Sequence, residues 1–227
     1  LVSGQKKPVG VNHESSSMER IKTNIEEVDR VLGNGIVDGS LILLSGEPGI
    51  GKSTLTLQIA SQVSRDKKTL LVSGEESTDQ ISLRANRLKV NEQNLLLLNE
   101  FSLENILLTI ENEKPEFVII DSIQVISSEE IPSTSGSVNQ VRYCTERFLE
   151  VAKKTSTPIL LIGHVTKDGN LAGPKVLEHL VDVVMNLEGD RFHQFRILRA
   201  TKNRFGSCNE VGIFEMQEEG LIEVKNP

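Results

Sequence analysis

The sequence predicts an α/β fold: a mainly parallel sheet flanked by helices, with antiparallel strands added near the C-terminus. Short apolar runs recur along the chain without strict alternation, as expected for strands that are buried on both faces. Helix-like stretches fill the gaps between these runs, and this alternation predicts parallel βαβ units. The predicted strands cover residues 41–45, 69–73, 117–121 and 159–163.

The predicted helices lie between and after these strands, at about residues 53–64, 78–88, 103–112 and 138–154, with a short helix at 175–180. Residues 1–19 are polar, and we expect them to form a flexible leader before a single domain over residues 20–227. The chain begins with Leu1 rather than Met, which favours a piece of a longer protein.

The end of the chain predicts the antiparallel strands. Residues 195–201 form one strand-like run, and residues 211–216 and 221–224 form two more. A four-residue turn that ends in a glycine, 217–220, separates the last two runs, which predicts a hairpin.

The composition bounds the class of protein. Aromatic residues make up 4% of the chain and tryptophan is absent, so the core must rest on Leu, Ile and Val. No apolar run approaches the ~18 residues that span a bilayer, and no signal segment opens the chain. We therefore expect a soluble, cytoplasmic protein with no membrane partner. The net charge of −7 argues against a globally cationic nucleic-acid coat, although a local basic patch is compatible with it.

Two cysteines, Cys144 and Cys208, are too few for a zinc framework. Cys144 stands at helical spacing from Val141 and Phe148, which favours a core position over a reactive thiol.

A phosphate-binding loop of the form GxxxxGK[ST] occupies residues 46–53. It follows the first predicted strand and opens the first predicted helix, which is the context that distinguishes this motif from an ordinary glycine-rich turn. The loop predicts binding of a nucleoside triphosphate. The predicted contacts are Gly46, Glu47, Pro48, Gly49, Ile50, Gly51, Lys52, Ser53 and Thr54.

The residue types in this loop fit that chemistry. Glycines let backbone N–H groups approach an anion, and the helix that starts near Lys52 adds its positive N-terminal dipole. Lys52 is expected to reach the β- and γ-phosphates, and Ser53 to offer its hydroxyl to Mg²⁺. The absence of an NKxD motif disfavours GTP, so ATP is the expected nucleotide.

Two other strand ends carry acids. Asp121 ends the apolar strand 117–121 and is the expected second partner of Mg²⁺; the alternative is a helix-capping aspartate. Glu75 and Glu76 follow the strand 69–73, where an acid would activate the attacking water. We favour Glu75 as this base, and both acids have the alternative role of complementing a helix dipole.

His164 ends the strand 159–163, where it would sense the γ-phosphate and transmit hydrolysis to the following loop. The alternative is a histidine that is simply satisfied at a strand end. No partner is predicted for His13, His179 or His193.

Five basic residues and no neutralising acid lie between Arg191 and Gly206; they are Arg191, Arg196, Arg199, Lys202 and Arg204. A solvated strand face is one explanation. Contact with phosphate, of a nucleic acid or of a neighbouring subunit's nucleotide, is the other.

The segments GEPGIGKST, VSGEES, IIDS, GHVTKDG and KNRFG together resemble the bacterial RadA (Sms) family over about residues 20–225. Many families share the phosphate loop, whereas KNRFG beside GHVTKDG is much more specific. The resemblance implies a RecA-like P-loop core related to DnaB-type helicases. It also implies a DNA-dependent ATPase that forms hexameric rings, processes branched recombination intermediates and has single-stranded or branched DNA and a recombinase such as RecA as partners.

By the same resemblance, Lys52, Ser53 and Asp121 match the nucleotide and magnesium positions, and Glu75 matches the glutamate of the second strand. Lys202 and Arg204, in KNRFG, would act across a subunit boundary on a neighbour's ATP or in coupling to DNA.

Two segments expected to be flexible, 127–139 and 165–174, match the DNA-facing loops of RecA-like rings. Lys167 and Lys175 are the candidate DNA-phosphate contacts. The family usually carries an N-terminal zinc finger and a C-terminal Lon-like domain that this sequence lacks, which puts ring stability and DNA affinity in doubt for an isolated core.

Two other classes of function compete with the motor. A nucleotide-gated signalling switch of the same fold, which binds a protein partner, remains the main alternative. A small-molecule phosphotransferase is disfavoured because no arginine-rich lid is present between the strands.

Overall fold

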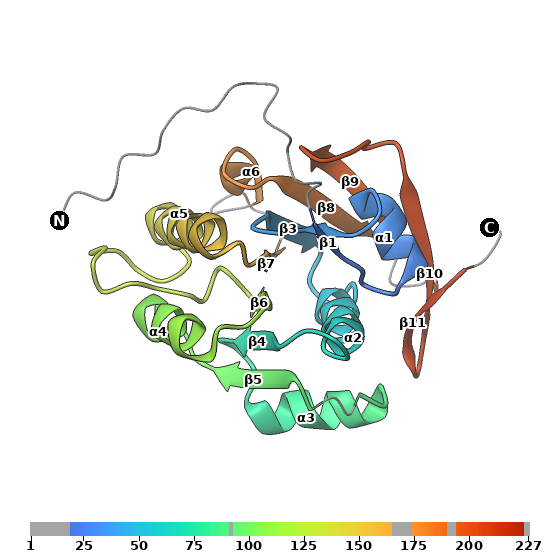
Figure 1. Ribbon diagram of the computed structural model, residues 1–227, viewed down its shortest axis with the longest axis horizontal. Helices are drawn as coiled ribbons and strands as arrows, with labels where there is room; N and C mark the ends of the chain where they lie inside the picture. The colour runs from blue at the N-terminus through green and yellow to red at the C-terminus, as the bar shows by residue number, and fades with distance from the viewer. Residues whose placement is uncertain (1–18, 91–92, 165–173, 190–193, 225–227) are drawn as a thin grey trace.

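The computed structural model describes residues 19–90, 93–164, 174–189 and 194–224. Within these residues a large twisted sheet has helices on both faces (Figure 1). A small antiparallel ribbon, β1 (Arg20–Ile21) with β2 (Ile36–Val37), precedes it.

The large sheet has nine strands in the described part of the chain, in the order β11-β10-β9-β8-β3-β7-β6-β4-β5. Its parallel strands are β3 (Leu41–Gly46), β4 (Thr69–Ser73), β5 (Leu95–Asn99), β6 (Phe117–Asp121), β7 (Ile159–His164) and β8 (Val183–Glu188). Three antiparallel strands extend the sheet beyond β8: β9 (Phe195–Asn203), β10 (Val211–Gln217) and β11 (Gly220–Glu223).

The helices are α1 (Glu26–Leu32), α2 (Lys52–Val63), α3 (Thr78–Arg87), α4 (Leu103–Glu113), α5 (Val138–Thr155) and α6 (Pro174–Leu177). Three of them begin after a serine whose hydroxyl accepts a hydrogen bond from a backbone N–H of the first turn, namely Ser77, Ser102 and Ser137. Such caps satisfy amide groups that have no partner inside the helix, and so fix where each helix begins.

Alternate residues of the buried strands face two separate cores. In β3, Ile42 and Leu44 pack with α1 and α2, whereas Leu41 and Leu43 pack with α4, α5 and α6 on the other face. Figure 1 shows the two groups of helices on opposite sides of the sheet. Burial on both faces explains why these strands read as uninterrupted apolar runs.

The predicted fold class is confirmed, and the four predicted strands and four longer predicted helices occur within two residues of their expected bounds. Five of the described elements were not predicted: β1, α1, β2, β5 and β8. The short helix predicted at 175–180 ends at Leu177. The hairpin turn is tighter than expected, because Gln217 pairs with Gly220 and leaves a two-residue loop.

Cys144 occupies the predicted core position and is fully buried on α5. Burial raises the pKa of its thiol to about 12, which removes its reactivity at neutral pH. Across the ranges that the structure describes, no helix is both long and apolar enough to cross a membrane.

Candidate nucleotide-binding site

The sheet brings four of the predicted catalytic residues, Lys52, Glu75, Asp121 and His164, to one edge. Since β3, β4, β6 and β7 are parallel, their carboxyl ends meet there. Gly46 pairs with His164 and Ser73 pairs with Asp121, so the phosphate-binding loop, both acidic strand ends and the histidine are neighbours.

The loop has the close backbone approaches that its glycines were expected to allow. A Cβ atom at Gly46 would lie 2.5 Å from the carbonyl oxygen of Leu187 on β8. Gly51 precedes α2 with φ +115°, in the region that favours glycine. The first turn of α2 contains no acid, so its N-terminal dipole is left to attract an anion.

The Lys52 side chain is turned back onto the loop. Its side chain is buried, and Nζ donates to the carbonyl oxygens of Gly46 and Glu47, each at 2.9 Å. Burial lowers the pKa of Lys52 to about 8, and the negative charges of Asp121 and Glu75 oppose the shift. A triphosphate would supply the counter-charge that this buried ammonium lacks.

Ser53 and Asp121, the two residues predicted to bind Mg²⁺, contact each other. The Ser53 hydroxyl hydrogen-bonds the Asp121 carboxylate, and burial is the main cause that raises the pKa of Asp121. A hydroxyl beside a carboxylate is the hard oxygen donor set that suits Mg²⁺, which takes its other ligands from water and phosphate. Both residues therefore fit the role proposed for them. Thr54 lies half-buried in the first turn of α2.

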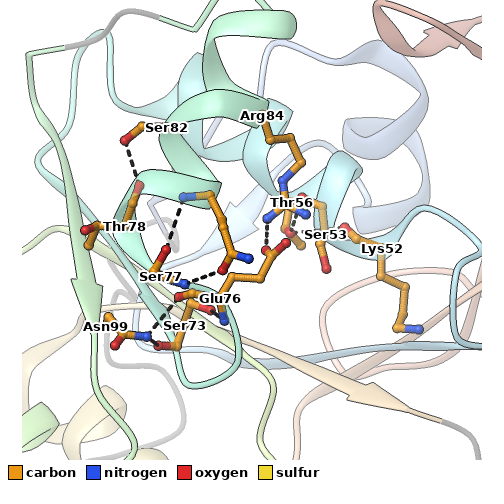
Figure 2. A network of polar contacts seen from close by, with 11 residues as sticks. Lys52, Ser53, Thr56, Ser73, Glu76, Ser77, Thr78, Ser82, Arg84 and Asn99 are labelled. Carbon is orange, nitrogen blue, oxygen red and sulfur yellow. Dashed lines mark hydrogen bonds and ion pairs between the residues drawn. The ribbon is translucent and has the colours of Figure 1, made fainter.

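The two glutamates that follow β4 have different surroundings. Glu75 accepts a hydrogen bond from the Ser122 hydroxyl at 2.8 Å and lies 3.6 Å from Nε2 of His164. Glu76 forms an ion pair with Arg84 of α3, which Figure 2 shows beside Ser53 and Lys52 in one view. The backbone of Glu76 is fixed by Ser73 and Asn99. Of the two glutamates, Glu75 is therefore the one that contacts Ser122 and His164 at the ends of the neighbouring strands.

His164 lies at the edge of the site, at the end of β7. Burial and the charge of Lys52 lower its pKa, while Glu75 opposes the shift. Its backbone carbonyl accepts from the Gln124 side chain at 3.3 Å. Among the described residues, buried Nδ1 of His164 and Oε1 of Gln124 have no hydrogen-bond partner. Two unsatisfied polar atoms at this edge fit a site that a ligand or water completes.

Arg196 has a role that the sequence analysis did not assign. The sequence left open whether Arg196 lies on a solvated strand face or contacts phosphate. Its side chain is buried, and Nε donates to the carbonyl oxygen of Ile50 at 3.0 Å. Arg196 therefore holds the backbone of the phosphate-binding loop in place at Ile50. Its position in β9 is in phase with Leu198 and Ala200, which also face inward, and this alternation is the signal that could have found it.

Arg84 and Ser122 are further residues that sequence reasoning missed. Arg84 acts on the Asp121 carboxylate as well as pairing with Glu76. It shares a helix face with buried Ile81, three residues earlier, and this spacing was the available signal.

Lys202 and Arg204 are not part of this site. Asn203 pairs with Val183, which in turn pairs with Ile42, so KNRFG lies at the amino edge of β3, opposite the phosphate-binding loop. Lys202 donates to the carbonyl oxygen of Glu178 at 2.6 Å, and Arg204 pairs with Asp182 at 3.1 Å. Burial and the neighbouring Arg204 charge lower the pKa of Lys202.

Of the two candidate DNA contacts, only Lys175 lies within the described residues. Lys175 is exposed on α6, whereas Lys167 and most of the segment 165–174 lie outside the described residues, as do Arg191, His13 and His193. His179 and Cys208 are exposed.

The segment 127–139 is more firmly held than its composition indicates. The buried Gln140 side chain donates to the carbonyl oxygens of Ser128, Ile131 and Ser133 and accepts from the Ser128 N–H. One amide thus fastens several backbone groups, which the expectation of a flexible segment did not foresee.

The lowered pKa of Lys52 predicts a pH-dependent stability. Between pH 8 and its ordinary value of 10.5, the folded protein has released this proton and the unfolded chain still binds it, so stability rises with pH. The free energy of unfolding of the nucleotide-free wild type, relative to that of Lys52→Met, should therefore increase over this range. Denaturant titrations at several pH values measure it, and a constant difference would contradict the assignment. Saturation with Mg²⁺ and an ATP analogue should flatten the dependence.

Comparisons with known proteins agree with this geometry. A protein-family model described as an AAA domain matches residues 7–170. The DNA repair protein RadA of Bacillus subtilis (strain 168) is 54% identical over 215 residues, a match that covers 94% of this chain and 47% of that protein. RadA of Streptococcus pneumoniae is 54% identical over 213 residues, 94% of this chain and 51% of its own length. The chain thus spans about half the length of these relatives.

A solved structure shows the same fold. The KaiC-like protein of the hyperthermophilic archaeon Pyrococcus horikoshii OT3 superposes with a TM-score of 0.74 at 17% identity, over 92% of this chain and all of that one. The fold, the phosphate-binding loop and the sequence matches lead to one conclusion: the chain belongs to the AAA-domain family and is a RecA-like ATPase core of the RadA (Sms) type.

Proposed function

We propose that this chain is the motor of a DNA repair protein: a DNA-dependent ATPase of helicase type that remodels branched recombination intermediates. It would work as a homo-hexameric ring that hydrolyses ATP at subunit interfaces. The observation that supports this most is the separation of its catalytic groups: the nucleotide site lies at the carboxyl edge of the sheet and the KNRFG cations lie at the amino edge.

The carboxyl edge would bind and cleave ATP. Lys52 would turn from the carbonyl oxygens of Gly46 and Glu47 to the β- and γ-phosphates, and Ser53 and Asp121 would hold Mg²⁺, which neutralises phosphate charge. Glu75 would take the proton of the attacking water, with Ser122 orienting its carboxylate. Neutral His164 would contact the γ-phosphate and pass the change to the segment that follows β7.

The amino edge would complete a neighbour's site. Lys202 and Arg204 cannot serve the phosphate-binding loop of their own chain, because the length of β3 separates them from it. A head-to-tail contact between identical copies brings unlike edges together, and a rotation that closes makes a ring. Arg204 would then stabilise the negative charge that develops on the neighbour's γ-phosphate.

The expected DNA contacts come from two segments that follow strands in the chain, 127–139 after β6 and 165–174 after β7. Lys175 is exposed on α6, which precedes β8. A ring repeats each cation in every subunit, so a chain with net charge −7 can still hold a DNA backbone. The relatives named as DNA repair proteins support DNA as the polymer.

The function is tested by ATP turnover with and without single-stranded DNA, with Bacillus subtilis RadA as the reference protein. We expect DNA to raise the turnover rate, and the effect to weaken steeply with salt as phosphate contacts are screened. A turnover rate that does not change with DNA but rises with a protein partner would instead indicate the signalling switch.

The roles of the two glutamates predict unequal effects of matched substitutions. Glu75→Gln should lower the turnover number by about 10²–10⁴-fold, the usual contribution of a general base, while nucleotide still binds. Glu76→Gln should leave most activity, since Glu76 faces Arg84 rather than the reactive groups. Steady-state kinetics and nucleotide titration measure both, and equal losses would show that Glu75 has no special role.

The trans role of Arg204 is tested by mixing two inactive variants. Lys52→Ala lacks a working phosphate loop, and Arg204→Ala should bind nucleotide but hydrolyse it slowly. In mixed rings, an intact loop of one subunit meets Arg204 of the other, so part of the activity should return. No recovery, with mixing confirmed by mass measurement, would exclude catalysis across the interface.

A further inference from the structure

Asp182 is a buried carboxylate at the start of β8 whose charge is shared between three elements. Its side chain is 2% exposed. Oδ2 accepts from the backbone N–H of Leu41 at 3.0 Å and from Nζ of Lys153 at 2.7 Å, and Oδ1 accepts from Nη1 of Arg204 at 3.1 Å. The amino end of β3, helix α5 and the KNRFG segment therefore meet at one side chain.

Arg204 is joined to Asp182 twice. Besides the side-chain contact, the backbone N–H of Arg204 donates to the backbone carbonyl of Asp182 at 3.1 Å. The backbone hydrogen bond fixes the position of the Arg204 Cα atom, and the Asp182 carboxylate fixes the orientation of the guanidinium. An arginine side chain has many rotamers, and such a double attachment removes much of that freedom in advance.

The pair is arranged asymmetrically with respect to solvent. Asp182 is buried, whereas the Arg204 side chain is 54% exposed. Within the residues that the structure describes, the guanidinium donates to Asp182 alone, so its other N–H groups remain for a group outside the chain.

The local charge also favours an incoming anion. One carboxylate is shared by two cations, Lys153 and Arg204, so the cluster keeps a positive charge at the surface. Lys202, whose ammonium donates to the Glu178 carbonyl oxygen, adds another positive charge, and the Glu178 carboxylate offsets part of it. Asp182 thus orients Arg204 without neutralising the surface around it.

We propose that Asp182 is a positioning residue for Arg204, which it holds in the direction that meets the triphosphate bound by a neighbouring copy. The inference rests on the proposed function, since it requires Arg204 to act on that nucleotide. Asp182 itself is too deeply buried to touch the nucleotide, so its effect on hydrolysis passes through Arg204.

The test is a double-mutant cycle on ATP turnover in the assembled protein. Asp182→Asn keeps the shape of the side chain and removes its charge, and it should lower the turnover number about tenfold or more, with the KM for ATP and the assembly state unchanged. In an Arg204→Ala background the same substitution should have no further effect. The matched control is Lys153→Gln, which removes the other cation on this carboxylate and should change turnover by less than about twofold.

The possible results distinguish a positioning role of Asp182 from a purely structural one. Normal or faster turnover of Asp182→Asn would overturn the inference, the faster case because Asp182 would then restrain Arg204. A further loss in the Arg204→Ala background, or an equal loss in Lys153→Gln, would assign Asp182 a structural role only. If Asp182→Asn does not fold, Asp182→Glu, which moves the charge by one methylene, must show the same dependence on Arg204. Normal turnover of Arg204→Ala alone would instead refute the trans role in the proposed function.

Discussion

The register of β3 is the constraint on which the rest of the structure depends. It pairs in parallel with β7 on one side and β8 on the other, and its residues alternate between two apolar cores. A shift of one residue would exchange the two faces of the strand, so that each side chain would point into the other core. The same register sets Gly46 beside His164 at one end and Leu41 beside Asp182 at the other. Both functional edges are therefore fixed by one buried strand.

Charged side chains at the nucleotide edge have partners within the chain. Lys52 donates to loop carbonyl oxygens, Asp121 accepts from Ser53, and Arg84 pairs with Glu76. Neutral partners compensate a buried charge incompletely, which is why burial dominates the shifted pKa values of Lys52 and Asp121. Binding of Mg²⁺ and a triphosphate would replace these contacts with charged ones.

Much of the nucleotide edge could be predicted from the sequence because chain order and spatial order coincide there. Apolar runs that end in or are followed by Asp121, Glu75 and His164 identify the strands. The chain direction then shows at which end of each strand the polar residue lies. The strand β5 was missed because Leu95–Leu98 form strands and helices equally well, and this partly exposed edge strand shows no alternation.

Contacts between distant segments were beyond sequence reasoning. The Arg196–Ile50 bond and the Asp182–Arg204 pair join residues 146 and 22 positions apart, and no local pattern identifies such partners. The KNRFG resemblance assigned a role to Arg204 but could not show that its own nucleotide loop was out of reach. That point needed the antiparallel return of β9 along β8.

The strand β9 has a consequence for how neighbouring sites would communicate. Near its start, Arg196 holds the nucleotide loop of its own chain through Ile50, and at its far end lie the cations that would meet the next chain's ATP. The strand is paired with β8 over this length, with a β-bulge opposite Val184 and Met185, so a displacement of the loop at one end would pass to the other end through a paired but locally bent strand. In a closed ring, β9 of each subunit would connect two successive ATP sites. Hydrolysis at one site would then affect the next site in one rotational direction.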